Sequence, residues 1–168
     1  MSVQTFERPV FNHVGFSVPR DALDAEGRKR IAGFFGNVFG FVERTGYTKD
    51  REFMVLTMGG PDQLIVFFGS DNPTTATPPN DHWGMRCHSL EQLQLYCDRA
   101  RAEVAKDPGI DFDDYSFALM EDMTPRHNLH RFYVRLGTPF TFEVQFYEWL
   151  DAGIGTTENA PQNTRESE

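Results

Sequence analysis

Two histidines begin closely similar segments of this chain, and their types and spacing indicate a metal site. His13 and His82 are each followed by an apolar residue, a glycine and a second apolar residue, and then by a polar and an apolar one. Each segment leads into a helical pattern and later into a strand-like run with a candidate ligand, Gln63 in the first half and Glu143 in the second. The chain therefore has the pattern of one unit repeated twice. Such a repeat can bring one histidine from each copy together across a pseudo-twofold axis.

A site of this composition would suit a divalent transition metal. Neutral imidazoles from His13 and His82 and the carboxylate of Glu143 are ligands that Zn²⁺, Fe²⁺, Mn²⁺, Co²⁺ and Ni²⁺ accept. The amide oxygen of Gln63 is a candidate fourth ligand, which leaves positions for water or a small-molecule substrate. An ion with an open position can polarise a carbonyl or an enolate, or activate dioxygen, depending on which ion is bound. We therefore predict one divalent metal ion as the cofactor.

Two further residues are candidates for a part in the reaction. His127 lies just before a strand-like run, where it could transfer a proton near the metal. Tyr133 shares a strand face with Arg131 and Arg135 and is expected to point into the cavity. For Tyr133 the alternative is packing in the core or at the rim, and for His127 it is an ordinary surface or hydrogen-bonded residue. The sequence leaves both choices open.

The elements that must position these residues follow from hydrophobic periodicity. Apolar residues recur at helical spacing over residues 21–40, and Gly40 is a suitable helix stop. A second helix is expected after Ser89, which forms a capping-box pattern with Gln92. The expected strands are 11–18, 41–48, 53–58 and 62–68 in the first half, and the His82 segment, 112–119, 130–136 and 140–148 in the second. In each half the ligands are expected on the strand face opposite the residues that pack on the helix, so all should lie on one concave surface.

These elements predict an α+β fold of two βαβββ modules that form a curved eight-stranded sheet with the helices on the outside. We assign residues 9–70 to the first module, 71–80 to a proline-rich linker, 81–150 to the second module and 151–168 to a disordered acidic tail. The offset from Gln63 to Glu143 exceeds the offset from His13 to His82 by eleven residues. This difference predicts an insertion in the second module, near residues 107–114.

Composition excludes several classes of partner. The chain has 25 acidic and 16 basic residues and a net charge of −9, so it lacks the positive clusters that bind nucleic acid. It has no run of ~20 apolar residues for a membrane span and no apolar signal segment at its start. Cys87 and Cys97 show no disulfide or metal-binding motif, which is typical of a reduced cytoplasmic protein. We therefore expect a cytoplasmic protein whose partner is a small-molecule substrate.

The arrangement resembles the vicinal oxygen chelate superfamily, which includes glyoxalase, bleomycin-resistance proteins and extradiol dioxygenases. The resemblance is carried by the two His-led strands, the segment 34–41, the segment 132–135 and the segment 142–144. It implies metal ligands at His13, Gln63, His82 and Glu143. It also implies a site built from modules of one chain or of two chains, so a homodimer is one expected arrangement. The ligand set looks most like the glyoxalase and epimerase branch, in which Glu143 would be both ligand and base while the metal stabilises an enediolate.

Two alternatives accompany this interpretation. The segment Arg126-His127-Asn128, with Tyr133 ten residues before Glu143, is similar to segments of Fe(II) extradiol dioxygenases that cleave catechols. In that branch a catalytic histidine is expected where Gln63 stands. The other alternative is a metal-free binding or resistance protein that sequesters a small aromatic compound in a cleft rich in phenylalanine, of which the chain has 16.

Overall fold

The computed structural model describes residues 11–73, 77–78 and 80–151, and it shows the βαβββ order twice. The elements of the first module are β1 (His13–Pro19), the 3-10 helix η1 (Arg20–Leu23), α1 (Ala25–Phe39), β2 (Val42–Glu43), β3 (Phe53–Thr57) and β4 (Leu64–Ser70). Those of the second are β5 (His82–Arg86), α2 (Leu90–Val104), β6 (Asp111–Met120), β7 (His127–Arg135) and β8 (Thr141–Trp149). Of the predicted acidic tail at 151–168, all but residue 151 lies outside the described residues, as do four residues of the linker.

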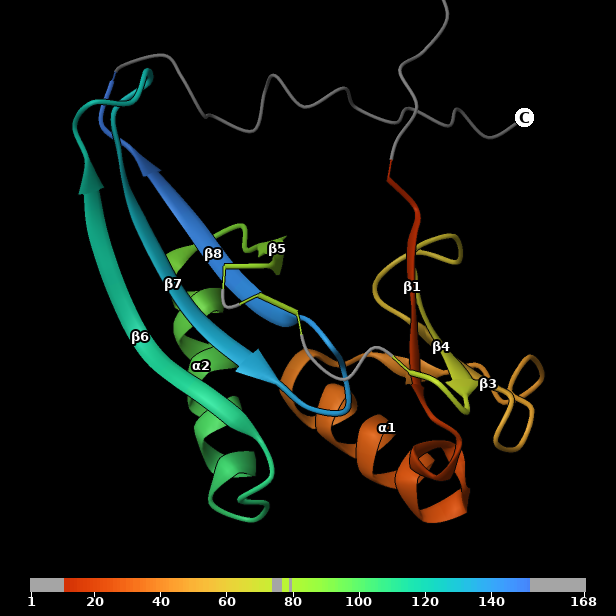
Figure 1. Ribbon diagram of the computed structural model, residues 1–168. Coiled ribbons are helices and arrows are strands. Elements are labelled where there is room, and N and C mark those ends of the chain that lie inside the picture. Colours follow the sequence, from red (N-terminus) through yellow and green to blue (C-terminus); the bar gives the residue numbers. More distant parts are fainter. Residues whose placement is uncertain (1–10, 74–76, 79, 152–168) are drawn as a thin grey trace, which may run out of the picture.

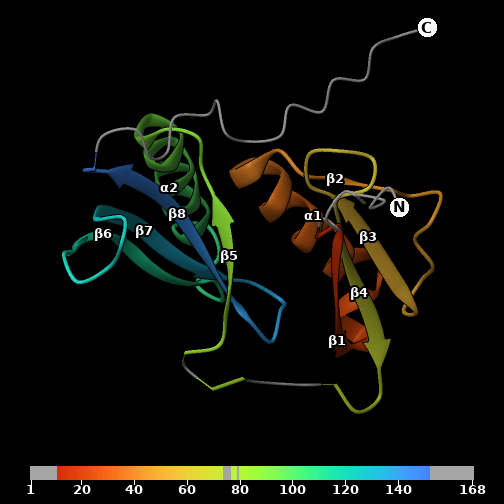
Figure 2. The same ribbon diagram turned by 90° about the horizontal axis from the view of Figure 1, so that it is seen from above.

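The strands form two hydrogen-bonded sheets of four, with the orders β1-β4-β3-β2 and β5-β8-β7-β6. In each sheet the first and last strands of the module pair in parallel, and the other pairs are antiparallel. The two sheets lie side by side, and β1 and β5 are the edges that face each other (Figure 2). The α+β class and the paired βαβββ modules are therefore confirmed, with the eight strands divided between two sheets.

The predicted helix stop at Gly40 and cap at Ser89 are both present, whereas the Asp24 cap was not predicted, since α1 begins at Ala25 and not at residue 21. The Asp24 side chain caps α1 by accepting a hydrogen bond from the backbone of Gly27 at 2.9 Å, and Gly40 ends the helix in the left-handed conformation. The Ser89 side chain caps α2 by accepting a hydrogen bond from the backbone of Gln92 at 3.1 Å. No helix in the described part of the chain is long and apolar enough to cross a membrane.

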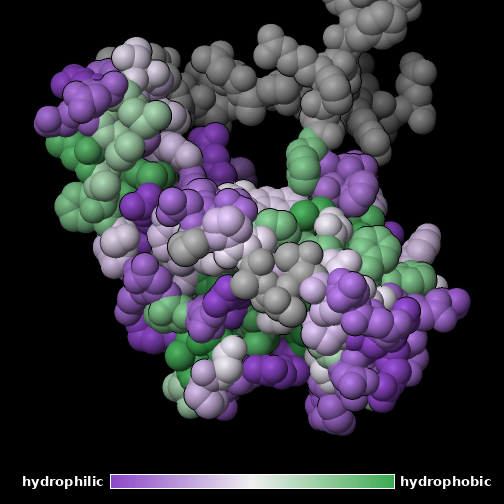
Figure 3. Space-filling model, viewed as in Figure 1, coloured by the Kyte–Doolittle hydropathy of each residue, from purple (hydrophilic) through white to green (hydrophobic). Residues whose placement is uncertain are grey.

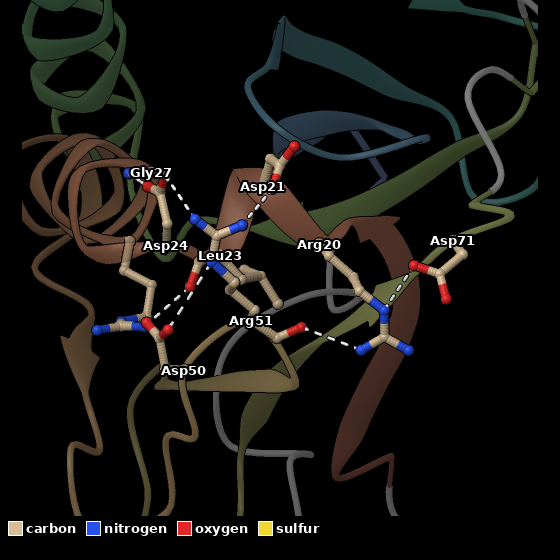
Figure 4. A network of polar contacts seen from close by, with 9 residues as sticks. Arg20, Asp21, Leu23, Asp24, Gly27, Asp50, Arg51 and Asp71 are labelled. Atoms are coloured by element: carbon tan, nitrogen blue, oxygen red, sulfur yellow. Dashed lines mark hydrogen bonds and ion pairs between the residues drawn. The ribbon is translucent and has the colours of Figure 1, made fainter.

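A network of ion pairs holds η1 and the start of α1 against the loop that leads into β3 (Figure 4). Arg51, whose φ of 56° lies in the left-handed region, donates to Asp21 at 2.5 Å. Arg28 donates both to the carbonyl of Leu23 at 2.8 Å and to Asp50 at 2.5 Å. These contacts join residues distant in sequence, so they fix the helix relative to the sheet that carries His13.

The two modules share one apolar core. α1 contributes Phe35, whose ring lies 6.1 Å from Phe67 of its own module and 5.4 Å from Phe142 of the other. The helices also contact each other, as in the edge-on pair of Phe39 and Tyr96 at 5.5 Å. Since the same side chains are buried by both sheets, neither module has a complete core alone.

The second sheet is longer than the first, and this is where the modules differ most in shape. β6 and β7 contain ten and nine residues, whereas β2 and β3 contain two and five. The expected strand 41–48 is reduced to Val42–Glu43, because residues 44–48 form a turn instead. Most of the extra length therefore lies in the β6–β7 hairpin and not in the loop predicted near 107–114. This hairpin and β8 extend past α2 (Figure 1), and apolar surface gathers at their far end (Figure 3), where Phe117 and Leu119 are exposed.

Candidate functional site

The parallel pairing of β5 and β8 brings His82 and Glu143 together. In this register Gly84, two residues after His82, lies opposite Glu143 on the neighbouring strand. The Nε2 atom of His82 lies 2.9 Å from Oε2 of Glu143. Glu143 is only 3% exposed, whereas His82 is exposed. The His82 imidazole therefore lines the cavity beside the second sheet, and Glu143 is buried behind it.

Three more side chains surround the buried carboxylate of Glu143. Tyr133, directly opposite on β7, donates its hydroxyl hydrogen to Oε1 at 2.6 Å. Arg131 donates to the same oxygen through Nη1 at 3.3 Å, and the amide of Gln145 donates to Oε2. A buried carboxylate needs such donors to offset the loss of water. These contacts hold Oε2 toward His82.

Tyr133 acts as a hydrogen-bond donor at neutral pH. Burial of its phenol, followed by the hydrogen bond to Glu143 and the charge of that carboxylate, raises its pKa from 10.0 to about 12. A phenolate at this position would face the carboxylate directly. The neutral phenol is therefore the form that orients Glu143.

The hydrogen bonds of His82 leave Nε2 suited to a cation. Its Nδ1 atom lies 2.9 Å from the backbone carbonyl of Asn80, and because a carbonyl can only accept, Nδ1 carries a hydrogen. In neutral His82 the lone pair of Nε2 then faces a carboxylate oxygen of Glu143 at 2.9 Å, which is favourable only with a proton or a cation between them. Ligands at ~2.0–2.2 Å from one ion lie roughly 3 Å apart when they are adjacent in an octahedral site and roughly 3.4 Å apart in a tetrahedral one. A carbonyl that fixes the other imidazole nitrogen is also the usual outer partner of a metal-bound histidine.

His13 begins β1 and has a similar local arrangement. Its imidazole is exposed, and Nδ1 lies 2.7 Å from the side-chain oxygen of Asn12, so Nε2 is left for another partner. Within residues 11–73, 77–78 and 80–151, however, no three His, Cys, Asp or Glu side chains lie close enough together to hold a metal. One chain thus brings His82 and Glu143 together without His13.

Gln63 does not face this cleft. It precedes β4 in a turn, where its backbone bonds with Gly60 and Met58, and its side chain lines a different crevice beside Tyr96. The next residues of the same strand face, Ile65 and Phe67, are fully buried on the helix side of the sheet. The expected placement of Gln63 with the other ligands is therefore not met, because the odd-numbered positions of β4 face α1.

His127 is also remote from the cleft. It is six residues before Tyr133 on β7, which is roughly 20 Å along an extended strand. The side chain is 5% exposed, contacts the Pro125 carbonyl through Nδ1 at 2.9 Å and packs against Tyr147 and Trp149. His127 is therefore a buried residue away from the cleft, whereas Tyr133 lines the cavity.

Comparison with solved structures identifies the fold. The chain is similar to the fosfomycin resistance protein FosX from Listeria monocytogenes, with a TM-score of 0.56 and 15% identity over 90% of this chain and 95% of that one. It is also similar to a glyoxalase/bleomycin resistance protein/dioxygenase from Alicyclobacillus acidocaldarius, with a TM-score of 0.53 and 19% identity over 83% and 91% of the two chains. A protein of the same description from Nocardioides has a TM-score of 0.52 and 16% identity over 90% and 91%. This chain has the vicinal oxygen chelate fold. The sequence matches no protein-family model and no curated protein significantly.

In this vicinal oxygen chelate fold the cleft contains groups that sequence reasoning missed. Asn80, Arg131 and Gln145 contact His82 or Glu143, yet none was predicted as part of the site. Strand alternation already placed Gln145 on the face of Glu143 and Arg131 on the face of Tyr133. The missing information was the register of β7 on β8, which sets Arg131 opposite Gln145. The cavity has a volume of about 940 Å³, and its lining includes His82, Tyr133, Arg131, Arg135, Asp111 and Asp113.

Proposed function

We propose that this protein is a metal-dependent enzyme that transfers a proton on a small oxygen-chelating substrate, as in glyoxalases and epimerases. One divalent ion would be held by His82 and Glu143 of one chain and by His13 of a second copy. The observation that carries the proposal is the 2.9 Å approach of His82 Nε2 to Glu143 Oε2, with the other imidazole nitrogen fixed by a carbonyl.

The residues of the cleft have distinct roles in this proposal. A bound ion would supply positive charge that polarises substrate oxygen atoms. Glu143 is the group that accepts the substrate proton, since its buried carboxylate lies directly behind the cavity-lining side chains of His82 and Tyr133. Tyr133 keeps a hydrogen bond on Oε1 and so positions the other oxygen. His82 is oriented by Asn80, which keeps its proton on Nδ1.

The second copy is needed because His13 does not meet His82 and Glu143 within the described part of one chain. β1 and β5 are both edge strands, and each begins with its histidine. A symmetric dimer that brings His13 of one chain to the His82–Glu143 pair of the other would complete two equal sites. Homodimer formation is therefore part of the proposed function.

The test is metal binding by mixed chains. We expect the native protein, purified and loaded with Zn²⁺ or Mn²⁺, to bind one ion per chain, measured by elemental analysis and titration calorimetry. His13→Ala and His82→Ala should each lose tight binding as pure proteins. When the two are unfolded together and refolded as mixed dimers, one of the two sites regains both histidines, so half of the mixed dimers' binding capacity should return.

His88→Ala is the matched control, because His88 is exposed and lies outside the cleft. If His13→Ala binds metal as well as His88→Ala does, His13 is not a ligand. If mixed dimers form but regain no binding, the two-chain site is wrong. Oxygen uptake with Fe²⁺ and a catechol would assign the dioxygenase reaction instead.

One observation favours a second function, that of a metal-free binding protein. Glu143 already contacts the cationic Arg131 at 3.3 Å, so its charge is partly compensated without an ion. Negligible metal content together with ligand binding that survives His82→Ala would select this function.

A further inference from the structure

The charged side chains of the cleft are paired unequally, and Arg131 is the least satisfied of them. Arg135 forms a close ion pair with Asp111, donating through Nε at 2.8 Å and also through Nη2. Arg131 instead makes a single long contact with Glu143, whose Oε1 is already taken at shorter distance by Tyr133. Its Nε is buried and, among the described residues, has no acceptor. Arg131 thus retains hydrogen-bonding capacity that the cleft itself does not use.

The position of Arg131 suits contact with a ligand. Its side chain is one-third exposed and lines the cavity together with His82 and Tyr133. The guanidinium carbon lies 5.5 Å from the centre of the Tyr133 ring, a cation–π distance that restricts the side chain. An arginine held in this way presents a planar set of donors, which matches the paired oxygens of carboxylates, phosphonates and phosphates.

The charge of the cleft also favours an anion once an ion is bound. Arg131 and Arg135 oppose Asp111, Asp113 and Glu143, so the fixed side-chain charges sum to −1 with His82 neutral. A divalent ion changes this sum to +1. A substrate with one negative charge would then neutralise the cleft, whereas a neutral substrate would leave Arg131 with only its 3.3 Å contact to Glu143.

We propose that Arg131 binds an anionic group of the substrate and thereby sets its class: a small carboxylate, phosphonate or phosphate whose oxygen atoms also lie toward His82 and Glu143. This inference rests on the proposed function for the role of the bound ion, but the contribution of Arg131 to anion binding can be measured separately. Arg131 is a specificity-determining residue in this view, and Glu143 remains the proton acceptor.

The test uses benzoate as the anionic probe and benzyl alcohol as a neutral probe of the same size, with binding measured by calorimetry and NMR on full-length protein. We expect benzoate to bind the Zn²⁺-loaded protein and Arg131→Gln to weaken that binding about 10–100-fold, the usual range for a charge-assisted hydrogen bond. Arg131→Lys should retain part of the affinity, because it keeps the charge and loses the planar fork. Binding of benzyl alcohol should change little in either variant.

The matched control is the double variant Arg20→Gln with Asp71→Asn, which removes an exposed 2.7 Å ion pair outside the cleft without changing the net charge. It should leave benzoate affinity nearly unaltered. Equal benzoate affinity in native protein and Arg131→Gln, or no benzoate binding by native protein in either the metal-free or the Zn²⁺-loaded form, would overturn the inference. Circular dichroism on each variant shows that the fold is retained, and Arg131→Lys provides the comparison if Arg131→Gln does not fold.

The results that would contradict this inference differ from the results that would contradict the proposed function. If the protein binds no metal but benzoate binding still depends on Arg131, the anion site stands and the metal enzyme does not. If metal binds as proposed while Arg131→Gln and native protein bind benzoate equally, the metal site stands and the anion site does not.

Discussion

The two modules share a backbone plan but present opposite chemistry on their concave faces. Gly15 pairs with Val66 in the first sheet as Gly84 pairs with Glu143 in the second. The first-module position that corresponds to Glu143 is therefore Val66, although His13 and His82 correspond to each other. The repeat conserves the place of the histidine and changes the acid into an apolar residue.

The same contrast extends to the neighbouring strand. Phe68 and Phe53 are paired in the first sheet, at the positions that Gln145 and Arg131 occupy in the second. Val55 is opposite Val66, as Tyr133 is opposite Glu143. The second module thus supplies a polar cleft, and the first supplies one histidine beside an apolar surface on which Phe68 is 48% exposed. The fold provides equivalent backbone positions in the two modules. The side chains at those positions determine which module can take part in a reaction.

Phe35→Ala should destabilise both modules together, because Phe35 of α1 packs against the other module as well as its own. Its ring contacts Phe67 and Phe142, so its removal leaves a cavity in the shared core, and we expect a loss of about 3–5 kcal/mol in the free energy of unfolding. Urea denaturation followed by circular dichroism measures this loss. Phe68→Ala, on the exposed concave face, should cost about 1 kcal/mol or less. Two separate unfolding transitions in Phe35→Ala would show that the modules do not share one core.

Glu143→Gln should remove the negative charge that distinguishes this position of the second module from Val66 of the first. The amide keeps the shape of the side chain but lacks the negative charge, so we expect metal affinity to fall by more than the ~10–100-fold typical of changes outside the first coordination sphere. Val66→Ala changes the equivalent position of the first module and should leave metal affinity unchanged. Calorimetric titration with Zn²⁺ compares the two. Native-like metal affinity in Glu143→Gln would falsify the assignment of Glu143 as a ligand.

A smaller effect is expected on the pKa of Tyr133, which depends on its hydrogen bond to the Glu143 carboxylate. Because its pKa is raised to about 12 in the folded protein, against 10.0 for an ordinary tyrosine, the folded state binds its proton more tightly than the unfolded state. Its contribution to stability is therefore complete below pH 10 and is lost as the pH rises toward 12. Absorbance titration of native protein and Tyr133→Phe isolates this group. Glu143→Gln should lower the pKa of Tyr133 without returning it to 10.0, since burial is the larger cause; an unchanged pKa would contradict the hydrogen bond.

The two equivalent glycines should give the smallest effects. A Cβ atom at position 15 would lie 2.8 Å from the Phe68 ring, and one at position 84 would lie 3.3 Å from the Gln145 amide. Gly15→Ala must displace an exposed ring, so we expect a cost of about 1 kcal/mol or less, and Gly84→Ala should cost less still. Denaturant midpoints measure both. A larger loss in Gly84→Ala would mean that the polar face tolerates less movement than the apolar one.

Local signals in the sequence determined much of the fold. The helical spacing of apolar residues and the capping patterns at Ser89 and Gly40 predicted both helices. Strand alternation placed Glu143, Gln145 and Tyr133 correctly with respect to the core. These features depend on neighbours within a few residues, so they can be read without knowledge of distant contacts.

Register, by contrast, was decided only by the tertiary structure. Gln63 and Val66 are three residues apart, and an odd shift along a strand moves a side chain to the opposite face of the sheet. The register of β1 on β4 places Val66, and not Gln63, at the position equivalent to Glu143. In the same way, the register of β7 on β8 brings Tyr133 and Arg131 next to Glu143. Hydrogen bonds between strands distant in sequence set these alignments. The sequence by itself therefore determined two repeated βαβββ modules with a histidine at the head of each, and long-range pairing decided which side chains meet in the cleft.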